Sequence, residues 1–349
     1  MVPMRIRLAV TVSAFLAFLV AGASPAQAHN VGGATSSNYR TRITSVEPDI
    51  DGITVRVVEA GARIELVNRT DDDVVVFGYK KEPYLRVGPD GVYQNIHSPA
   101  TYLNRSMVPM ADVTLPEQAD ARAEPEWKKV SDDHKARWHD HRSHHMGTRA
   151  PPKVRQAPGE THNLRPFQVR MTHAGTDVEV RGDLFWIPGP SRWTWLGPAL
   201  LVGAAVALLV ARSRRGDPGP VRFALAATLA VILVLDVARF TGQASDADIS
   251  FPSALGDNLL AVVTWAAALA ALVFLVRRGL REAAPVLAAA GLLFALGSLV
   301  DLDLLTHSQL PSTAPEWVSR LAVAAGFGLG AGLAGAAIAR IMRPPVTSA

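Results

Sequence analysis

The hydrophobic pattern of the chain changes character once, near residue 190. Before that point, short apolar segments alternate with polar and turn-forming residues. After it, apolar residues run for stretches of about 20 positions, the length that crosses a bilayer as a helix. The pattern therefore predicts a β-rich domain over 29–190, a transmembrane domain over 191–343 and a short cytoplasmic tail over 344–349.

The β-rich part is marked by β-branched segments between turn-forming residues. Three such segments lie at 53–58, 62–67 and 73–77, set apart by Gly and Asp residues, and a second β-like region covers 167–186. Short strands at this spacing are typical of an antiparallel sandwich. We therefore expect an all-β sandwich of the Ig-like or cupredoxin-like type.

The membrane part contains five predicted helices, at about 193–211, 221–240, 257–276, 283–305 and 317–339. Arginines cluster between the first and second helices, between the third and fourth, and after the fifth, whereas the loops 241–256 and 306–316 contain no Lys or Arg. Loops rich in Lys and Arg stay on the cytoplasmic side. We expect a multi-pass protein of the plasma membrane, with lipid as its partner, the β-rich domain extracytoplasmic and the C-terminus cytoplasmic.

The first 28 residues resemble a secretory signal peptide. Arg5 and Arg7 precede an apolar run, and the segment closes with Ala26-Gln27-Ala28, which is the pattern that signal peptidase cleaves. The alternative is an uncleaved first transmembrane helix, for which the apolar run is short. Cleavage after Ala28 would make His29 the first residue of the mature chain.

Composition excludes several classes of function. Residues 29–192 carry 22 Lys and Arg against 22 Asp and Glu, and residues 193–349 carry 11 against 9, so no basic surface for nucleic acid is predicted. The chain has no cysteine, which excludes disulfides and thiolate ligands. No nucleotide-binding glycine motif, zinc-protease motif or serine-hydrolase motif is present, and no enzymatic activity is predicted.

Five of the ten histidines crowd into twelve residues. Imidazole is the commonest protein ligand of copper, zinc and nickel. A strand would bring His139, His141 and His145 to one face, and a helix would group His134, His141 and His145, or His141 with His144. The predicted metal ligands are His139, His141, His144 and His145, with Asp140 as a ligand or supporting partner and with His134 and Met146 as further candidates. The alternative is a solvated loop without a specific role.

His29 and the methionines point to copper. A free N-terminal histidine offers both its amine and its ring to one ion, and nitrogen-rich coordination favours Cu(II). Met107, Met110 and Met146 add soft thioethers that suit Cu(I). We therefore expect a copper ion as cofactor, and a membrane-anchored protein that handles it outside the cytoplasm, with a metal-transfer protein as a candidate partner.

Ionisable residues also lie near the ends of the predicted helices, and such residues in a membrane are candidates for function. Asp236, Asp301, Asp303 and His307 are predicted on the outer side. One interpretation is a local ion pair of Asp236 with Arg239, with Asp301 and Asp303 among lipid headgroups. The other is an acidic vestibule that receives a cation from the histidine-rich domain.

Two resemblances follow from these features. A mature chain that begins with histidine and continues into a β-sandwich resembles periplasmic copper-binding proteins of the CopC type. The segments 82–93, 97–104 and 137–146 are similar to those of uncharacterised exported multi-pass membrane proteins of actinobacteria. The second resemblance implies the architecture and brings no activity with it.

A second hypothesis for function needs no metal. In it, the extracytoplasmic domain is a module that binds cell-envelope proteins or wall material, and the helices are its anchor. Five helices are more than an anchor needs, and this favours the metal-handling hypothesis.

Overall fold

The computed structural model describes residues 33–105, 113–147, 149–213 and 219–342. The predicted signal peptide, His29, Met107, Met110 and the tail 344–349 lie outside these ranges. The chain divides into two compact units, one comprising Thr35–Gly189 and the other containing the helices after Pro190. Ten antiparallel strands followed by five long apolar helices confirm the predicted order of a β-domain and a helical part.

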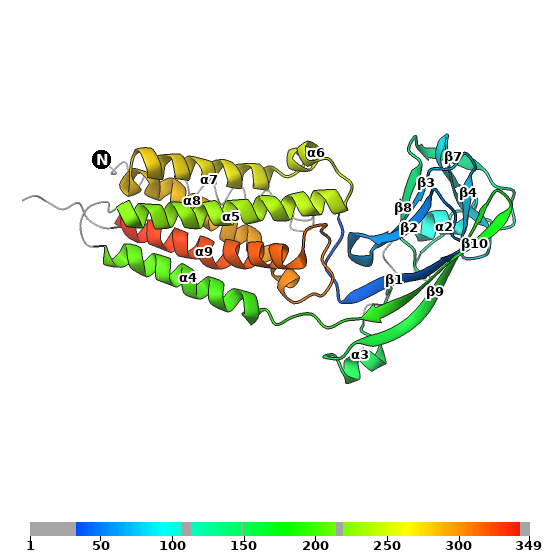
Figure 1. Cartoon of the computed structure of the whole chain (residues 1–349), viewed down its shortest axis with the longest axis horizontal. Coiled ribbons are helices and arrows are strands. Elements are labelled where there is room, and N and C mark those ends of the chain that lie inside the picture. Colours follow the sequence, from blue (N-terminus) through cyan, green and yellow to red (C-terminus); the bar gives the residue numbers. More distant parts are fainter. Residues whose placement is uncertain (1–32, 106–112, 148, 214–218, 343–349) are drawn as a thin grey trace, which may run out of the picture. The chain divides into compact units, whose positions relative to one another are not determined.

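The β-unit is built from two antiparallel sheets (Figure 1). The larger sheet has the order β1 (Tyr39–Glu47), β10 (Thr176–Trp186), β9 (His162–His173), β4 (Val74–Phe77), β5 (Pro83–Gly88), β6 (Gly91–Asn95) and β7 (Trp127–Ser131). The smaller sheet has the order β2 (Ile53–Val58), β3 (Arg63–Asn68) and β8 (Lys135–Trp138). Short helical segments complete the unit: η1 (Glu59–Gly61), α2 (Pro99–Leu103) and α3 (Pro152–Gln156).

One hydrophobic core joins the two sheets. Ile64 and Trp138 of the smaller sheet pack with Val87, Val169 and Met171 of the larger one, and all are at most 4% exposed. Apolar and polar residues alternate along the strands, and successive side chains of a strand point to opposite faces, so that one face of each sheet packs into this core. In β2, for example, Thr54 and Arg56 are exposed while their neighbours are half-buried or buried. The β-unit therefore has the layered form of a sandwich.

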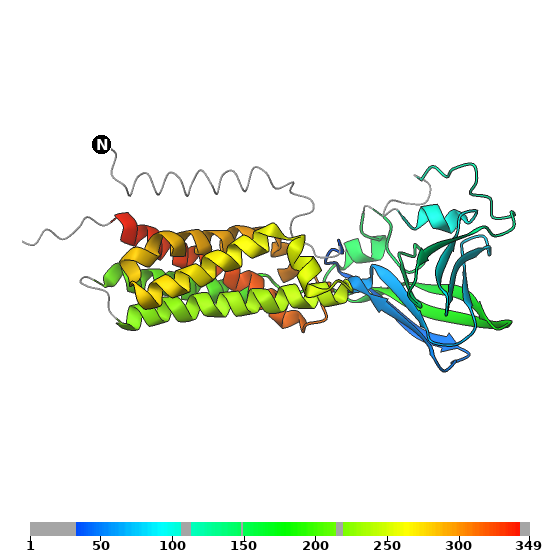
Figure 2. The ribbon, with the colours of Figure 1, turned by 90° about the horizontal axis from the view of Figure 1, so that it is seen from above.

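The helical unit contains α4 (Trp193–Arg212), α5 (Gly219–Asp246), α7 (Leu259–Arg277), α8 (Leu280–Val300) and α9 (Glu316–Met342). These are the five helices long and apolar enough to cross a membrane among the described residues. The short segments α6 (Phe251–Gly256) and η3 (Leu302–Leu305) lie between them. Figure 2 shows the long helices side by side within their unit.

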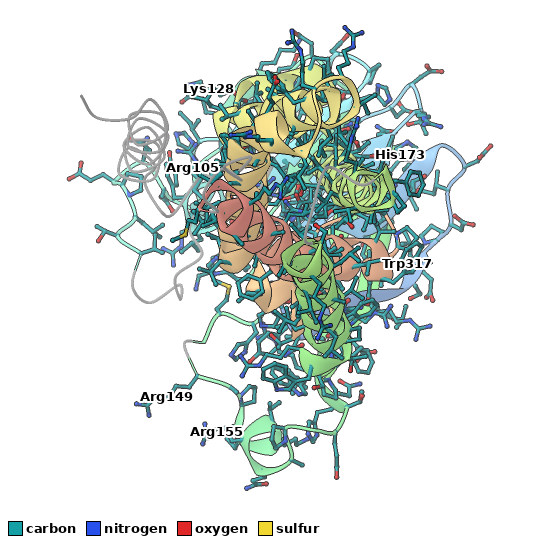
Figure 3. The ribbon with its side chains drawn as sticks, turned by 90° about the vertical axis from the view of Figure 1, so that its left-hand side faces the viewer. Arg105, Lys128, Arg149, Arg155, His173 and Trp317 are labelled. Atoms are coloured by element: carbon teal, nitrogen blue, oxygen red, sulfur yellow. The ribbon has the colours of Figure 1, made fainter. Side chains whose placement is uncertain are left out.

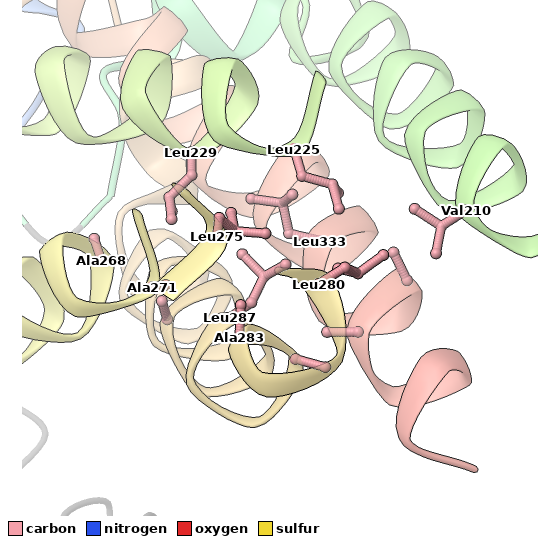
Figure 4. Close-up of a cluster of buried hydrophobic side chains, with 14 of the residues drawn as sticks. Val210, Leu225, Leu229, Ala268, Ala271, Leu275, Leu280, Ala283, Leu287 and Leu333 are labelled. Carbon is pink, nitrogen blue, oxygen red and sulfur yellow. The ribbon is translucent and has the colours of Figure 1, made fainter. Parts of the chain in front are cut away.

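The helices pack around a core of Leu and Ala and leave other apolar side chains outside. Leu225, Leu275 and Leu333 are at most 1% exposed and meet in one cluster (Figure 4). Leu201 and Phe223, by contrast, are 73% and 76% exposed, as expected for side chains that contact lipid.

The glycines of α9 serve close packing between helices. A Cβ on Gly328 would lie 2.7 Å from the carbonyl carbon of Ala199 on α4, and one on Gly330 would lie 2.8 Å from the carbonyl oxygen of Gly291 on α8. Backbones approach this closely only where small residues allow it. These glycines therefore allow close contact of α9 with α4 and α8.

Candidate metal centre

After β8, residues 139–146 of the histidine-rich segment form a turn, and this histidine turn adopts neither the strand nor the helix considered for it. Antiparallel pairing places Trp138 of β8 opposite Ile64 of β3. The chain therefore leaves the sheet at His139, beside the residues that precede β3. The segment is polar but buried, since His139 is 6% and His141 2% exposed.

Three imidazole rings meet in this turn. The ring centroid of His139 lies 5.2 Å from that of His141 and 4.9 Å from that of His144, both in edge-on contact. The Sδ atom of Met146 lies 3.4 Å from Nε2 of His139. Three of the four principal predicted histidines, and one of the methionines, are thus brought together.

The second ring nitrogen of two of these histidines faces a backbone carbonyl. Nδ1 of His139 is 2.7 Å from the carbonyl oxygen of Ala62, and His144 forms a backbone hydrogen bond with Gly61. A carbonyl oxygen only accepts, so the His139 proton is on Nδ1 and the lone pair is on Nε2. Metal-binding histidines are commonly oriented by a hydrogen bond of this kind.

The carbonyls come from a strained turn. Glu59 and Ala60 both have φ of 55°, and Gly61 has φ of 95°. Left-handed conformations cost a non-glycine residue about 1–2 kcal/mol. Buried Glu59 is held by Arg63 at 3.0 Å and by Arg137 at 3.4 Å, and this anchors the turn that presents the carbonyls to the rings. Strain of this type concentrates at functional sites.

Hydrogen bonds from distant parts of the chain fix the backbone of the histidine turn. Nη2 of Arg165, on β9, donates to the carbonyls of His141 and His144 at 2.9 and 2.6 Å. Oγ1 of Thr41, on β1, donates to the carbonyl of Ser143 at 2.6 Å. The turn is therefore held in place from the larger sheet.

Asp140 takes a supporting position. Its fully buried carboxylate accepts from Nε and Nη2 of Arg142 at 2.9 and 2.8 Å and from Nε1 of Trp138 at 3.0 Å. Burial opposes ionisation of Asp140, but these donors and the Arg142 charge outweigh it and hold its pKa below the usual range. Of the two roles predicted for Asp140, the contacts fit that of a partner behind the ligands.

His145 and His134 lie apart from the three rings. The ring of His145 stacks on Tyr39 with centroids 4.4 Å apart, and its Nε2 is 3.1 Å from the carbonyl oxygen of Arg149. His134 is at the opposite end of β8, half-exposed, with Nδ1 3.3 Å from Oδ1 of Asp133. The side chains of Arg149 and Arg155 extend outward from the segment that follows the turn (Figure 3).

Burial favours the neutral form of the rings of His139 and His144. It lowers the pKa of His144 to about 4, assisted by the neighbouring His139, and it also lowers the pKa of His139. Neutral imidazole is the form that binds a metal. His139 and His144 are therefore in the metal-binding form at neutral pH.

The rings lie in contact with one another, and in the part of the chain that the structure describes no three His, Cys, Asp or Glu side chains converge as metal ligands. The thioether of Met146 is a fourth donor of a different kind.

A hollow of about 710 Å³ adjoins the turn. His141, His145 and Met146 line one part of it, and Leu164 and Leu184 line another. The donors of the turn are thus reachable from the surface of the β-unit.

In the helical unit, Arg239 contacts both Asp236 and Asp301, and His307 contacts Asp303. Nη2 of Arg239 lies 3.1 Å from Oδ1 of Asp236, which is the local pair expected from the sequence, and its Nη1 lies 2.6 Å from Oδ2 of Asp301. Asp301 is only 4% exposed. Nδ1 of His307 lies 3.7 Å from Oδ2 of Asp303, four residues earlier.

Several residues of this site are not evident from the sequence. Arg165 and Thr41 reach the turn from other strands, and no local pattern marks them. Gly61 is one of the glycines that separate the predicted strands, but its contact with the histidines depends on the pairing of β3 with β8. Comparison with models of protein families, with curated proteins and with solved structures finds no match to this chain.

Proposed function

We propose that the β-unit binds a copper ion at His139, His141, His144 and Met146, and that the protein handles this metal outside the cytoplasm. The helices would hold it in the plasma membrane with the β-unit extracytoplasmic and the C-terminus cytoplasmic. The two packed sheets are compatible with an Ig-like or cupredoxin-like sandwich. His29, as the first residue after signal cleavage, would add a further ligand.

One observation carries this proposal: Nε2 of His139 and Sδ of Met146 face each other at 3.4 Å. The Nδ1–H group of His139 donates to the carbonyl oxygen of Ala62. Burial lowers the pKa of the ring and so disfavours a second proton on it. Two lone pairs therefore point at one another, an arrangement that a shared cation stabilises. Imidazole and thioether together suit Cu(I) better than they suit hard cations.

The hollow beside the turn supports a second candidate. Its lining combines Pro151, Leu164 and Leu184 with the basic Lys153 and Arg165. Such a surface fits a protein partner, which is either the metal-transfer protein of the copper proposal or a cell-envelope component bound without metal. Copper handling requires the histidines of the turn as ligands, whereas binding of a cell-envelope component without metal does not.

The test is copper affinity of the full-length protein in lipid nanodiscs. Cu(I) affinity is measured by competition with a chromophoric chelator for the wild type and for Met146→Leu, which removes sulfur and keeps the volume. Loss of one of four ligands should weaken Cu(I) binding about tenfold or more. His139→Gln should weaken Cu(I) and Cu(II) binding together.

Matched controls distinguish copper binding at the histidine turn from nonspecific binding of copper. Met342→Leu alters a side chain that is 78% exposed in the helical unit, and His134→Gln alters the half-exposed histidine of the same segment. If Met146→Leu and His139→Gln bind copper as these controls do, the copper site is refuted. Retained binding of an envelope protein by those two variants would then favour the interaction module.

A further inference from the structure

A second hollow of the β-unit lies between β1 and β2, and none of its lining residues is a proposed copper ligand. β1 is the terminal strand of the larger sheet and β2 is a terminal strand of the smaller one. The hollow has a volume of about 500 Å³, which is within the range of small-molecule sites. The residues that line it, and that define the arginine groove, are Arg40, Thr41, Arg42, Ile43, Val55, Arg56 and Val57.

Two arginines on one wall of the arginine groove are open to a ligand. Arg40 and Arg42 are exposed, whereas Thr41 between them is only 7% exposed, so the two arginines share the outer face of β1. Neither guanidinium forms a hydrogen bond or an ion pair with another residue that the structure describes. Each guanidinium therefore offers its N–H donors outward.

The charges around the groove do not cancel. Nε of Arg56, on the opposite wall, is 2.5 Å from Oε1 of Glu65, and Oε2 of the same carboxylate is 2.6 Å from Nε of Arg137. Asp183 of β10 is the register partner of Arg42. These groups leave a net charge of +2, from Arg40, Arg42, Arg56 and Arg137 against Glu65 and Asp183.

The neighbouring carboxylates leave this excess in place. Glu59 is paired with Arg63 at 3.0 Å, so that pair adds no net charge. Asp49 and Asp51, in the turn between β1 and β2, are at least five residues from the arginines of the groove, or roughly 16 Å along an extended chain. Charges at this separation are largely screened, because the screening length is about 8 Å at physiological salt.

The composition of the lining indicates the class of ligand. Guanidinium groups bind phosphate through paired N–H donors. Ile43 and Val55, which are half-buried against the hydrophobic core, add apolar surface to the same groove. A phospholipid carries its phosphate next to apolar carbon, whereas inorganic phosphate offers nothing to the apolar part of the lining.

The chain also keeps the β-unit close to lipid. The β-unit ends at Gly189 and α4, the first of the long apolar helices, begins at Trp193. The connection is therefore at most about 14 Å long at ~3.5 Å per residue. Arg40 and Arg42 pair with Phe185 and Asp183, near the end of β10 that leads into this connection. A short tether of this kind gives a ligand in the bilayer a high effective concentration at the β-unit.

We propose that the arginine groove binds the phosphate group of an anionic phospholipid, with Arg40 and Arg42 as its donors. Arg56 adds positive charge from the facing wall, and Ile43 and Val55 contact the apolar part of the lipid. This interaction does not depend on copper. It makes the β-unit a sensor of the lipid composition of the bilayer that holds the helices.

The experiment measures hydrogen–deuterium exchange of the full-length protein in nanodiscs. One sample contains phosphatidylcholine only, and a second contains added phosphatidylglycerol as the anionic phospholipid. A third adds glycerol 3-phosphate to the phosphatidylcholine nanodiscs, and so presents a phosphate ester without an acyl chain. The test variant combines Arg40→Gln with Arg42→Gln. The control combines Arg122→Gln with Arg170→Gln, which removes the same charge from exposed arginines outside the groove.

Phosphatidylglycerol should slow exchange in the peptides of β1 and β2 in the wild type and in the control. The fraction of phosphatidylglycerol that gives half of this protection should rise at least about fivefold in the test variant. In the wild type, protection should weaken near 1 M salt, where the screening length is about 3 Å. Arg40 and Arg42 are exposed, so the test variant should keep its fold, which circular dichroism checks.

The proposal is overturned if the wild type shows no protection, if protection is the same in the two variants, or if it is indifferent to salt. Equal protection by glycerol 3-phosphate overturns it as well, because the groove would then be a site for soluble phosphate esters.

Discussion

Lowering the pH from 7 to 4 tests the burial of the histidine turn in the metal-free protein. The pKa of His144 is about 4 in the folded chain, against 6.5 for an unperturbed histidine. In this window the unfolded state binds a proton that the folded state excludes, so stability falls as the pH falls. The stability is fully present above pH 6.5 and is lost progressively down to about pH 4.

The structure sets the size of this effect. At 1.36 kcal/mol per pKa unit, the shift of His144 corresponds to a loss of about 3 kcal/mol, taken as an upper limit. Burial is the main cause, and His139, His145 and His141 add to it, while the hydrogen bond to Gly61 opposes it. With a urea dependence of about 1–3 kcal/mol per molar, the urea midpoint of the β-unit should fall by roughly 1–3 M.

Pulse proteolysis in urea measures this stability in the full-length protein after treatment with chelator. A tag on the β-unit follows its cleavage apart from that of the helices. His144→Gln should flatten the pH profile between 6.5 and 4, whereas His134→Gln, at the half-exposed end of β8, should leave it unchanged. If His144→Gln and the wild type lose the same stability over this window, the inferred burial of the ring is wrong.

Three further substitutions test the packing. Ala60→Gly should stabilise the β-unit by up to about 1 kcal/mol, because φ of 55° is strained for alanine; the urea midpoint measures this. Glu65→Gln should destabilise the unit by about 3–5 kcal/mol, because Glu65 is fully buried and its Oε2 lies 2.6 Å from Nε of Arg137; an unchanged midpoint would contradict this. Gly328→Val should abolish a stable bundle, because its Cβ would meet Ala199 at 2.7 Å; size-exclusion chromatography of the solubilised protein shows the outcome.

Local patterns explain much of the fold. β2 coincides with the predicted strand over 53–58, since β-branched residues alternate there and Gly52 supplies a turn with φ of 85°. Helix ends were harder to predict. α5 continues to Asp246 although residues 241–246 are polar or small, because tertiary contacts hold this part; the carbonyl of Gly242, for example, accepts from the amide of Thr313 at 3.0 Å.

The sites depend on contacts that are distant in sequence. The i,i+3 spacing was enough to predict the pair of Asp236 with Arg239, but Asp301 joins it from 62 residues further along the chain. In the histidine turn, spacing alone allowed a strand or a helix. The three histidines that meet, His139, His141 and His144, are not the set predicted for a strand or for a helix. Hydrogen bonds to the carbonyls of Ala62 and Gly61 orient the rings of His139 and His144.

The donors of the histidine turn favour a soft ion. The turn offers nitrogen and sulfur, and its carboxylate, Asp140, is occupied by Arg142 and Trp138. A hard cation, which prefers carboxylate oxygens, would therefore meet none that is open to it among these donors, whereas imidazole and thioether suit copper.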